Sequence, residues 1–346
     1  MLSLNTAQAE RILEAFIPKG HNVLLAGSPG CGKSAIVTQT AKRIGYDCAI
    51  FHPVVSDPTD FKGFPWVNRE TNTAEFVPFG EFAKLLTAKK PTVAFFDDVG
   101  HAPKAVQATL MQPLFARTLN GHRIPDCVSF VLATNRRGDK AGVEGIIDPI
   151  ISRCHGVYEI APDLDTFLAY WIGSGKGPEV YNYLQKWKPD HLYIQKKTAD
   201  IENYPCYRTW DFANDILALH LPQDLELNAL SGALGAGVAG EFVTYLSRYR
   251  ELPDPDEVFK NPAKAPIPKK PDMQYAFCAA VAFRCTVQTF PAIAAYTERL
   301  AKEGYEEIAM CLLGDSLRRC PEDGVRKSAE CQKLLVGRLG KMLTGK

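Results

Sequence analysis

The stretch LLAGSPGCGKSAIV, Leu24 to Val37, is the most informative segment of the sequence. An apolar run leads into a glycine-rich segment, and Lys33-Ser34 then opens a pattern typical of a helix. The segment matches G-x-x-x-x-G-K-[ST] at every fixed position, and this motif requires a strand before it and a helix after it. Glycines let backbone N–H groups converge on phosphate oxygens, and the helix N-terminus adds positive potential. The stretch therefore predicts a phosphate-binding loop.

The residue types in this loop suggest separate tasks. Lys33 is expected to reach the β- and γ-phosphates of a nucleotide, and the Ser34 hydroxyl to bind Mg²⁺. Cys31 fills a variable position and is interpreted as a tolerated small residue; a thiol at a helix N-terminus can instead have a lowered pKa, so an oxidation-sensitive cysteine is the alternative. The predicted nucleotide-binding residues of the loop are Gly27, Ser28, Pro29, Gly30, Cys31, Gly32, Lys33 and Ser34.

Two further apolar runs end in polar residues. TVAFFDDVGHAP, residues 92–103, carries Asp97-Asp98 at the end of a candidate strand. In that position Asp97 is expected to hold Mg²⁺ through water and Asp98 to polarise the attacking water, although an ordinary acidic pair is the alternative. VSFVLATN ends in Asn135, which can orient the lytic water if its strand lies between the other two. Asparagine is also a common turn former at strand ends.

Residues 1–161 alternate between short apolar runs and helical periods. This alternation predicts an α/β fold, with a parallel five-stranded sheet and helices on both faces. The segment FPWVNRETNTAEFVPF, residues 64–79, interrupts the alternation and predicts an inserted β-hairpin. The expected strands are Val23–Ala26, Cys48–His52, Thr92–Phe96, Cys127–Thr134 and Gly156–Ile160. The expected helices are Lys33–Ile44, Phe82–Leu86, Lys104–Ala116 and Glu144–Ser152.

Helical periods dominate after Pro162. We expect a helical lid over residues 162–221 and a helical C-terminal region over residues 222–346, with a Pro- and Lys-rich linker at 252–272.

The 40 Lys plus Arg nearly balance the 39 Asp plus Glu, which argues against binding nucleic acid through bulk charge. The ten cysteines lack the spacing of a metal site. Without a secretory signal or an apolar run of membrane length, we expect a cytoplasmic protein with no membrane partner.

In sequence order, GSPGCGKS, FFDDVG, ATN and DPIISRC resemble the motifs of the AAA+ superfamily. The likeness covers roughly residues 5–220, and HPVVSDPTDFKGFPW is similar to the segment before the helix-2 insert of the MoxR-like branch. By position, the resemblance implies that Asn135 is sensor 1, Arg153 the arginine finger and Arg208, in YPCYRTW, sensor 2. Arg136 and Arg137 are further candidates to face a neighbouring subunit. Without the resemblance, a surface salt bridge is the ordinary role of such arginines.

The resemblance implies an ATPase that uses ATP and Mg²⁺, assembled as a homo-oligomeric ring, expected to be a hexamer. Its implied function is that of a MoxR-like remodelling or chaperone-like motor acting on a partner protein, such as a von Willebrand factor A domain protein. A nucleic-acid motor or loader is one alternative. A nucleotide-gated switch that hydrolyses ATP slowly is the other, because the family usually has Asp-Glu where this chain has Asp97-Asp98.

Overall fold

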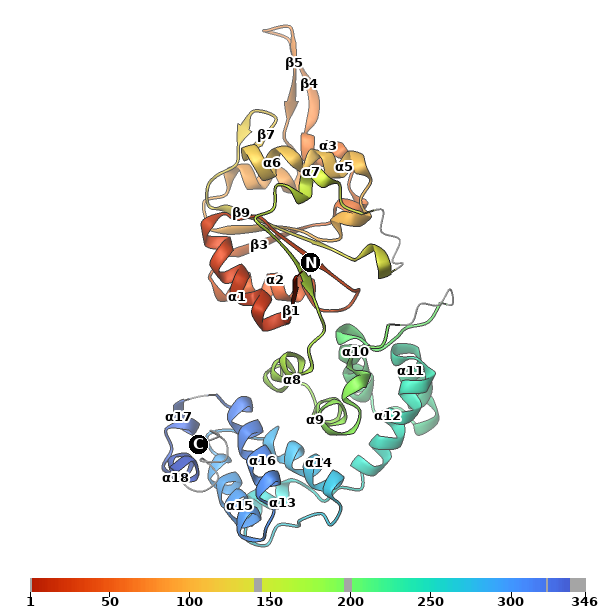
Figure 1. The fold of residues 1–346 in the computed structure, drawn as a ribbon, viewed down its shortest axis with the longest axis vertical. Coiled ribbons are helices and arrows are strands. Elements are labelled where there is room, and N and C mark those ends of the chain that lie inside the picture. The colour runs from red at the N-terminus through yellow and green to blue at the C-terminus, as the bar shows by residue number, and fades with distance from the viewer. Residues whose placement is uncertain (1, 140–144, 196–200, 322, 337–346) are drawn as a thin grey trace. The chain divides into compact units, whose positions relative to one another are not determined.

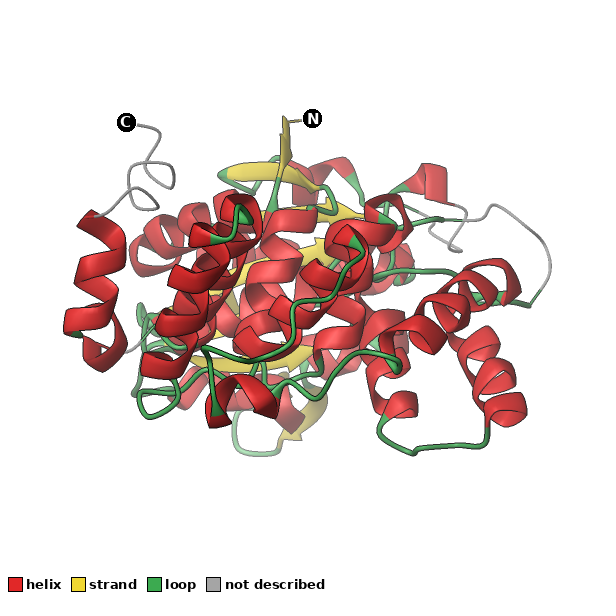
Figure 2. Cartoon of the chain, turned by 90° about the horizontal axis from the view of Figure 1, so that it is seen from below, coloured by secondary structure: helices red, strands yellow, loops and turns green. Residues whose placement is uncertain are grey.

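The computed structural model describes residues 2–139, 145–195, 201–321 and 323–336. The chain divides into two compact units, Met1–Asp163 and Leu164–Lys346. The first unit is an α/β domain and the second is helical, and all strands of the described residues lie in the first (Figures 1 and 2). Within the described part of the chain, no helix combines the length and the apolar character needed to cross a membrane.

A six-stranded sheet, with neighbouring strands parallel throughout, forms the centre of the first unit. β2, β6 and β9 are buried along their whole length, because helices cover both faces of a sheet of this kind. In spatial order the strands are β1 (Leu2–Leu4), β10 (Gly156–Ile160), β2 (Val23–Gly27), β9 (Val128–Thr134), β6 (Thr92–Phe96) and β3 (Asp47–Phe51).

All five predicted strands are present, but the predicted number of strands was wrong. The sixth strand, β1, pairs with β10 at the edge of the sheet. β1 has 3 residues, Leu2–Leu4, and a segment of that length is too short to show the alternation of a strand.

Helices lie on both faces of the sheet, as predicted. α1 (Thr6–Phe16) and α2 (Lys33–Arg43) cover one face (Figure 1). The opposite face carries α3 (Pro58–Lys62), α4 (Gly80–Ala83), α5 (Lys104–Thr109), α6 (Met111–Ala116) and α7 (Asp148–Ile151).

Several predicted helix limits differ from the observed ones. The helix predicted over 104–116 is divided at Leu110, because Pro113 has no N–H to donate to the carbonyl of Thr109. The segment 82–86 forms the end of α4 and a following 3-10 turn, Lys84–Thr87. Of the helix predicted over 144–152, the structure has only α7, and residue 144 lies outside the described residues.

The predicted hairpin is confirmed as β4 (Phe64–Asn68) paired antiparallel with β5 (Thr73–Val77). It projects away from the sheet of the first unit (Figure 1). Its apolar side chains are exposed, Trp66 at 65% and Val67 at 61%. A shorter hairpin of β7 (Thr118–Leu119) and β8 (His122–Arg123) was not predicted.

Two hydrophobic cores hold the second unit together. One core joins residues 167–246 with Ala279 and Phe283, and the other joins residues 258–334. The predicted linker 252–272 includes a short helix, α13 (Asp256–Lys260). The other helices of this unit are α8 (Leu164–Gly173), α9 (Pro178–Asn182), α10 (Tyr207–Leu217), α11 (Gln223–Leu234), α12 (Ala236–Tyr249), α14 (Pro271–Ala282), α15 (Phe290–Lys302), α16 (Glu306–Arg319), α17 (Asp323–Arg326) and α18 (Ala329–Val336).

Candidate functional site

The order of the strands brings the three sequence motifs to one edge of the sheet. β9 lies between β2 and β6 and runs parallel to both, as the interpretation of Asn135 required. The carboxyl ends of parallel strands meet at the same edge, which is where ligands bind in open α/β sheets. The glycine-rich loop after β2, the acidic pair after β6 and Asn135 after β9 are therefore neighbours.

The backbone of the loop explains its glycines. Gly30 and Gly32 have φ angles of 75° and 91°, a left-handed region that side chains with a Cβ rarely adopt. A Cβ on Gly27 would lie 2.9 Å from the Cys31 Sγ and 2.9 Å from the Ile160 carbonyl oxygen. Lys33 follows as the first residue of α2, so the N-terminal N–H groups of this helix border the loop.

The Lys33 ammonium is buried beneath the loop and makes three hydrogen bonds. It donates to the carbonyl oxygens of Gly27 at 2.9 Å and Ser28 at 3.1 Å, and to Asn135 Oδ1 at 2.7 Å. Because a lysine ammonium has three donors, these partners account for all of them. The lysine of the loop and the predicted sensor asparagine are thus in direct contact.

Ser34 and Asp97 form the candidate metal site. The Ser34 hydroxyl donates to Asp97 Oδ2 at 2.5 Å. The other oxygen, Asp97 Oδ1, accepts the backbone N–H of Asp98 at 3.0 Å, and the Asp97 N–H donates to the Phe51 carbonyl at 2.9 Å. A hydroxyl beside a carboxylate is a donor set that suits Mg²⁺, so these residues fit the predicted ion.

Asp98 lies next to Asn135 and His101. Its backbone is left-handed, with φ of 54°, and its side chain is 43% exposed. Asn135 Nδ2 lies 3.4 Å from Asp98 Oδ1 and 3.4 Å from His101 Nε2. The same Asp98 oxygen is 3.6 Å from His101 Nδ1. Sequence analysis missed His101, whose only signal was its position three residues after Asp98.

Arg136, directly after Asn135, binds groups of its own chain. Its guanidinium donates to the Ser28 hydroxyl and the Glu159 carboxylate, and to Asp139 at 3.0 Å and 2.9 Å. These bonds, first of all the one to Asp139, raise the pKa of Arg136 above its ordinary value. The guanidinium of Arg136, predicted as a candidate to face a neighbouring subunit, thus binds groups within its own chain. The side chain of Arg137 lies outside the described residues.

Cys31 is fully buried, and burial raises the pKa of its thiol. The alternative of an oxidation-sensitive thiol with a lowered pKa was wrong, because desolvation outweighs the nearby positive charge of Lys33. The thiol instead packs against Gly27, where it fills the space that a Cβ would take.

Arg153 lies just beyond α7. Its guanidinium donates to the Pro149 carbonyl at 2.6 Å and lies 5.5 Å from the ring centroid of Phe115. The buried side chain of Asn22 donates to the Arg153 carbonyl at 2.9 Å, which fixes the backbone there. Arg153 forms no ion pair with any residue that the structure describes, so the salt-bridge alternative does not explain it.

Arg208 belongs to the second unit. It is the second residue of α10, its side chain is exposed, and no described residue forms an ion pair with it. Its role as sensor 2 stays a prediction from the sequence resemblance.

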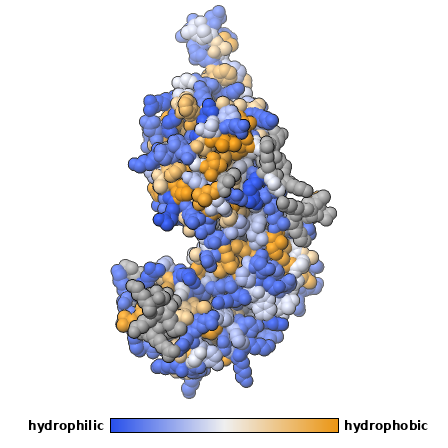
Figure 3. Space-filling model, viewed as in Figure 1, coloured by the Kyte–Doolittle hydropathy of each residue, from blue (hydrophilic) through white to orange (hydrophobic). Residues whose placement is uncertain are grey.

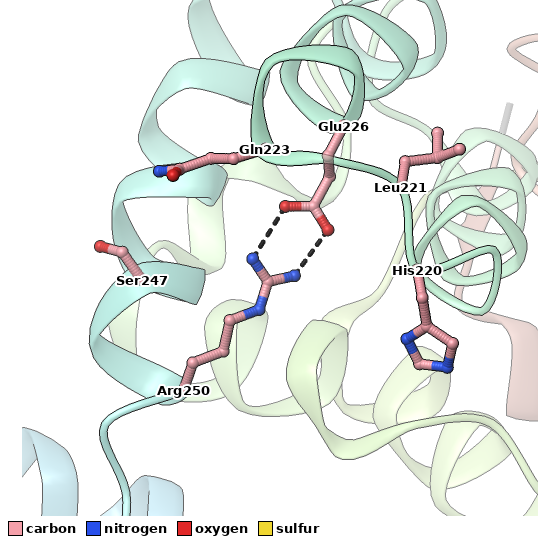
Figure 4. A pocket seen from close by; sticks show the side chains of 6 residues that line it. All are labelled: His220, Leu221, Gln223, Glu226, Ser247 and Arg250. Atoms are coloured by element: carbon pink, nitrogen blue, oxygen red, sulfur yellow. Dashed lines mark hydrogen bonds and ion pairs between the residues drawn. The ribbon is translucent and has the colours of Figure 1, made fainter.

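Each unit also contains a pocket. In the first unit, Asn135 and Arg136 help to line a pocket of about 700 Å³. A pocket of about 390 Å³ in the second unit contains a forked ion pair between Glu226, 1% exposed, and Arg250 (Figure 4). This pair joins α11 to the end of α12, and the pocket includes none of the predicted site residues.

The fold and the loop define an α/β domain of the P-loop class. Residues 22–154 match the family model described as the AAA domain, dynein-related subfamily. A search of curated proteins found no match.

The comparison with solved structures found matches of low sequence identity and low TM-score. A mutant of RuvB from Thermotoga maritima is 15% identical, with a TM-score of 0.41, over 75% of this chain and 77% of that one. Another structure, the Thermotoga maritima RuvB Holliday junction branch migration motor, is 17% identical, with a TM-score of 0.39, over 65% and 67%. NtrX from Brucella abortus in complex with ADP is 14% identical, with a TM-score of 0.35, over 71% and 67%.

Proposed function

We propose that the first unit binds ATP with Mg²⁺ and hydrolyses it to ADP and phosphate. The observation that carries this proposal is the meeting of Lys33, Asn135 and the Ser34–Asp97 pair at one edge of the sheet. The match of residues 22–154 to an AAA domain supports it. An acidic pair without the loop, or a loop without the acidic pair, would not suffice for phosphoryl transfer.

Each of these side chains has a task in the proposed reaction. Lys33 binds phosphate oxygens, which replace acceptors that its ammonium now contacts, including Asn135 Oδ1. Asn135 is then free to orient the water that attacks the γ-phosphate. Ser34 and Asp97 would hold Mg²⁺, which neutralises charge on the phosphates when bound. Asp98 accepts the proton of the attacking water, and its exposure leaves room for that water.

A slowly hydrolysing ATP switch is the second candidate, and the environment of Asp98 favours it. Aspartate is one methylene shorter than the glutamate usual in the resembled family, and its carboxylate already lies 3.4 Å from Asn135 Nδ2. Single-turnover kinetics separate the two candidates: a switch retains ATP over many minutes, whereas a motor releases phosphate repeatedly.

The proposed active form is a ring, expected to be a hexamer, in which Arg153 completes the site of the adjacent subunit. Hydrophobic surface gathers around α7 (Figure 3), where Phe115 is 77% and Ile151 39% exposed. The guanidinium of Arg153 lies beside this surface without an ionic partner among the described residues. A guanidinium suits the charge of a transferring phosphoryl group. Arg208, from the proposed lid, is assigned the role of sensor 2.

We further assign the chain the role of a MoxR-like remodelling motor in the cytoplasm. The projecting hairpin β4–β5, with Trp66 and Val67 exposed, is the proposed contact to a partner protein. A von Willebrand factor A domain protein is the partner that the sequence resemblance suggests. A nucleic-acid motor has less support, because the charge of the chain is nearly balanced.

The test of the proposed function is the release of phosphate from ATP by the purified chain. We expect turnover that depends on Mg²⁺ and rises with protein concentration as rings form. Adding single- or double-stranded DNA is expected to leave the rate unchanged. Stimulation by DNA would favour a nucleic-acid motor, and failure to bind ATP would contradict the proposed function.

A further inference from the structure

The residue after the predicted sensor forms a second connection between β9 and the phosphate-binding loop. Asn135 contacts Lys33 at the end of the loop, and Arg136 contacts Ser28 near its start. Asn135 and Arg136, which directly follow β9, therefore contact the two ends of the phosphate-binding loop. None of the sequence motifs predicted the contact at Ser28.

The contact of Arg136 with Ser28 is part of a closed network. The Ser28 hydroxyl receives a hydrogen bond from Arg136 and donates to Asp139 Oδ1 at 3.3 Å. Asp139, with a side chain 5% exposed, also accepts two bonds from Arg136, and Glu159 of β10 accepts a third. The guanidinium is thus held by two carboxylates on different elements, and its planar fork loses little entropy on binding Ser28.

The two carboxylates that pair with Arg136 make it a poor ligand for phosphate. To bind a phosphate, the guanidinium would have to leave these carboxylates, and both would then lack a counter-charge. It can still fix a neutral hydroxyl. We propose that Arg136 is a positioning residue, which acts through Ser28 to hold the phosphate-binding loop in shape and does not bind the nucleotide itself. This inference deepens the proposed ATP site and rests on it for its effect on affinity.

The positioning role can be measured without nucleotide. Hydrogen–deuterium exchange of the loop peptide, residues 24–37, is expected to accelerate about tenfold in Arg136→Gln. The acceleration should be smaller in Arg136→Lys, which keeps the charge and a donor but lacks the planar fork. Arg43→Gln is the matched control, because Arg43 pairs with two carboxylates, Glu10 and Glu14, at the far end of α2. Wild-type exchange of the loop in Arg136→Gln would overturn the inference.

Nucleotide affinity supplies the second readout. In Arg136→Gln and in Ser28→Ala we expect the Kd of a fluorescent ATP analogue to rise about tenfold. The double variant should show no further rise in Kd, because both substitutions remove the same contact between Arg136 and Ser28. Fully additive losses would overturn the role of Ser28 as the intermediary. If wild type does not bind the analogue, the proposed function fails, whereas the exchange experiment still decides whether Arg136 holds the loop.

Discussion

The Ser34 hydroxyl lies 2.5 Å from Asp97 Oδ2, although the two residues are separated by 63 positions in the chain. Ser34 is the last residue of the first motif and the second residue of α2, and Asp97 directly follows β6, the strand of the second motif. Their contact follows from the order of β2, β9 and β6 in the sheet. It joins the two motifs into one candidate site for Mg²⁺ and a nucleotide.

Replacing Asp97 with asparagine should alter the dependence of ATP hydrolysis on Mg²⁺. An amide is a weaker ligand for a hard cation than a carboxylate, so we expect the Mg²⁺ concentration for half-maximal activity to rise about tenfold or more. The measurement is a titration of Mg²⁺ at fixed ATP. A titration curve identical to that of wild type would exclude Asp97 as a ligand.

Changes at Asp98 should affect turnover more than binding. Asp98→Asn is expected to keep the affinity for Mg²⁺ and ATP and to reduce kcat about a hundredfold or more, the scale of general-base contributions. Asp98→Glu is the companion variant: a higher kcat would indicate that the short side chain limits hydrolysis. Unchanged turnover in Asp98→Asn would assign the proton transfer to another group.

Arg153→Ala should lower ATPase activity about a thousandfold, as expected for an arginine finger, with little change in affinity. Because the finger is proposed to act on a neighbour, mixing Arg153→Ala with Lys33→Ala subunits should restore part of the activity. Arg11→Ala, at an exposed position of α1, is a control for loss of a surface arginine. Activity that does not depend on protein concentration, together with no rescue on mixing, would contradict the action in trans.

Protonation of His155 at low pH should weaken the backbone contact next to Arg153. The imidazole Nδ1 of His155 accepts the Asn22 N–H at 3.0 Å, and only the neutral ring can accept there. Burial, followed by the charge of His21, lowers the pKa of His155 below its ordinary value of 6.5. A lowered pKa in the folded state contributes stability above about pH 6.5 that is lost as the pH falls further.

We therefore expect the protection of the Asn22 amide against hydrogen exchange to fall below pH 6.5, after correction for the intrinsic rate. His155→Gln retains an acceptor that does not titrate, and its protection should change less over the same range. Equal pH dependence in both proteins would exclude His155 as the titrating group.

The sequence predicted the strands that hold the site because their signals are local. β6 and β10 were both located to the residue. β6 is a fully buried parallel strand, which is a continuous apolar run between polar ends, whereas β10 is mostly half-buried and contains Glu159. The strand β1, of 3 residues, carries no such run, and its pairing depends on β10, far along the chain. The break in the helix over 104–116 was predictable from Pro113, whose effect on the preceding turn is local.

Contacts between side chains from distant segments were not predictable in the same way. The contact of Lys33 with Asn135 spans 102 positions, and the contact of Arg136 with Ser28 spans 108. Both require the order of the strands in space, which the motifs imply only through resemblance to a family. The raised pKa of Cys31 has a similar origin, because it depends on burial by the folded loop.

The affinity of Lys33→Ala for ATP is the most direct test of the account. Removing the ammonium leaves the phosphates without their main point charge, so we expect binding of a fluorescent ATP analogue to fall at least a hundredfold, to the limit of detection. Lys42→Ala is the matched control, because Lys42 is an exposed lysine in the last turn of the same helix, α2. The account predicts wild-type affinity in Lys42→Ala and none in Lys33→Ala. Equal affinities in both variants and wild type would contradict the assignment of this loop to phosphate binding.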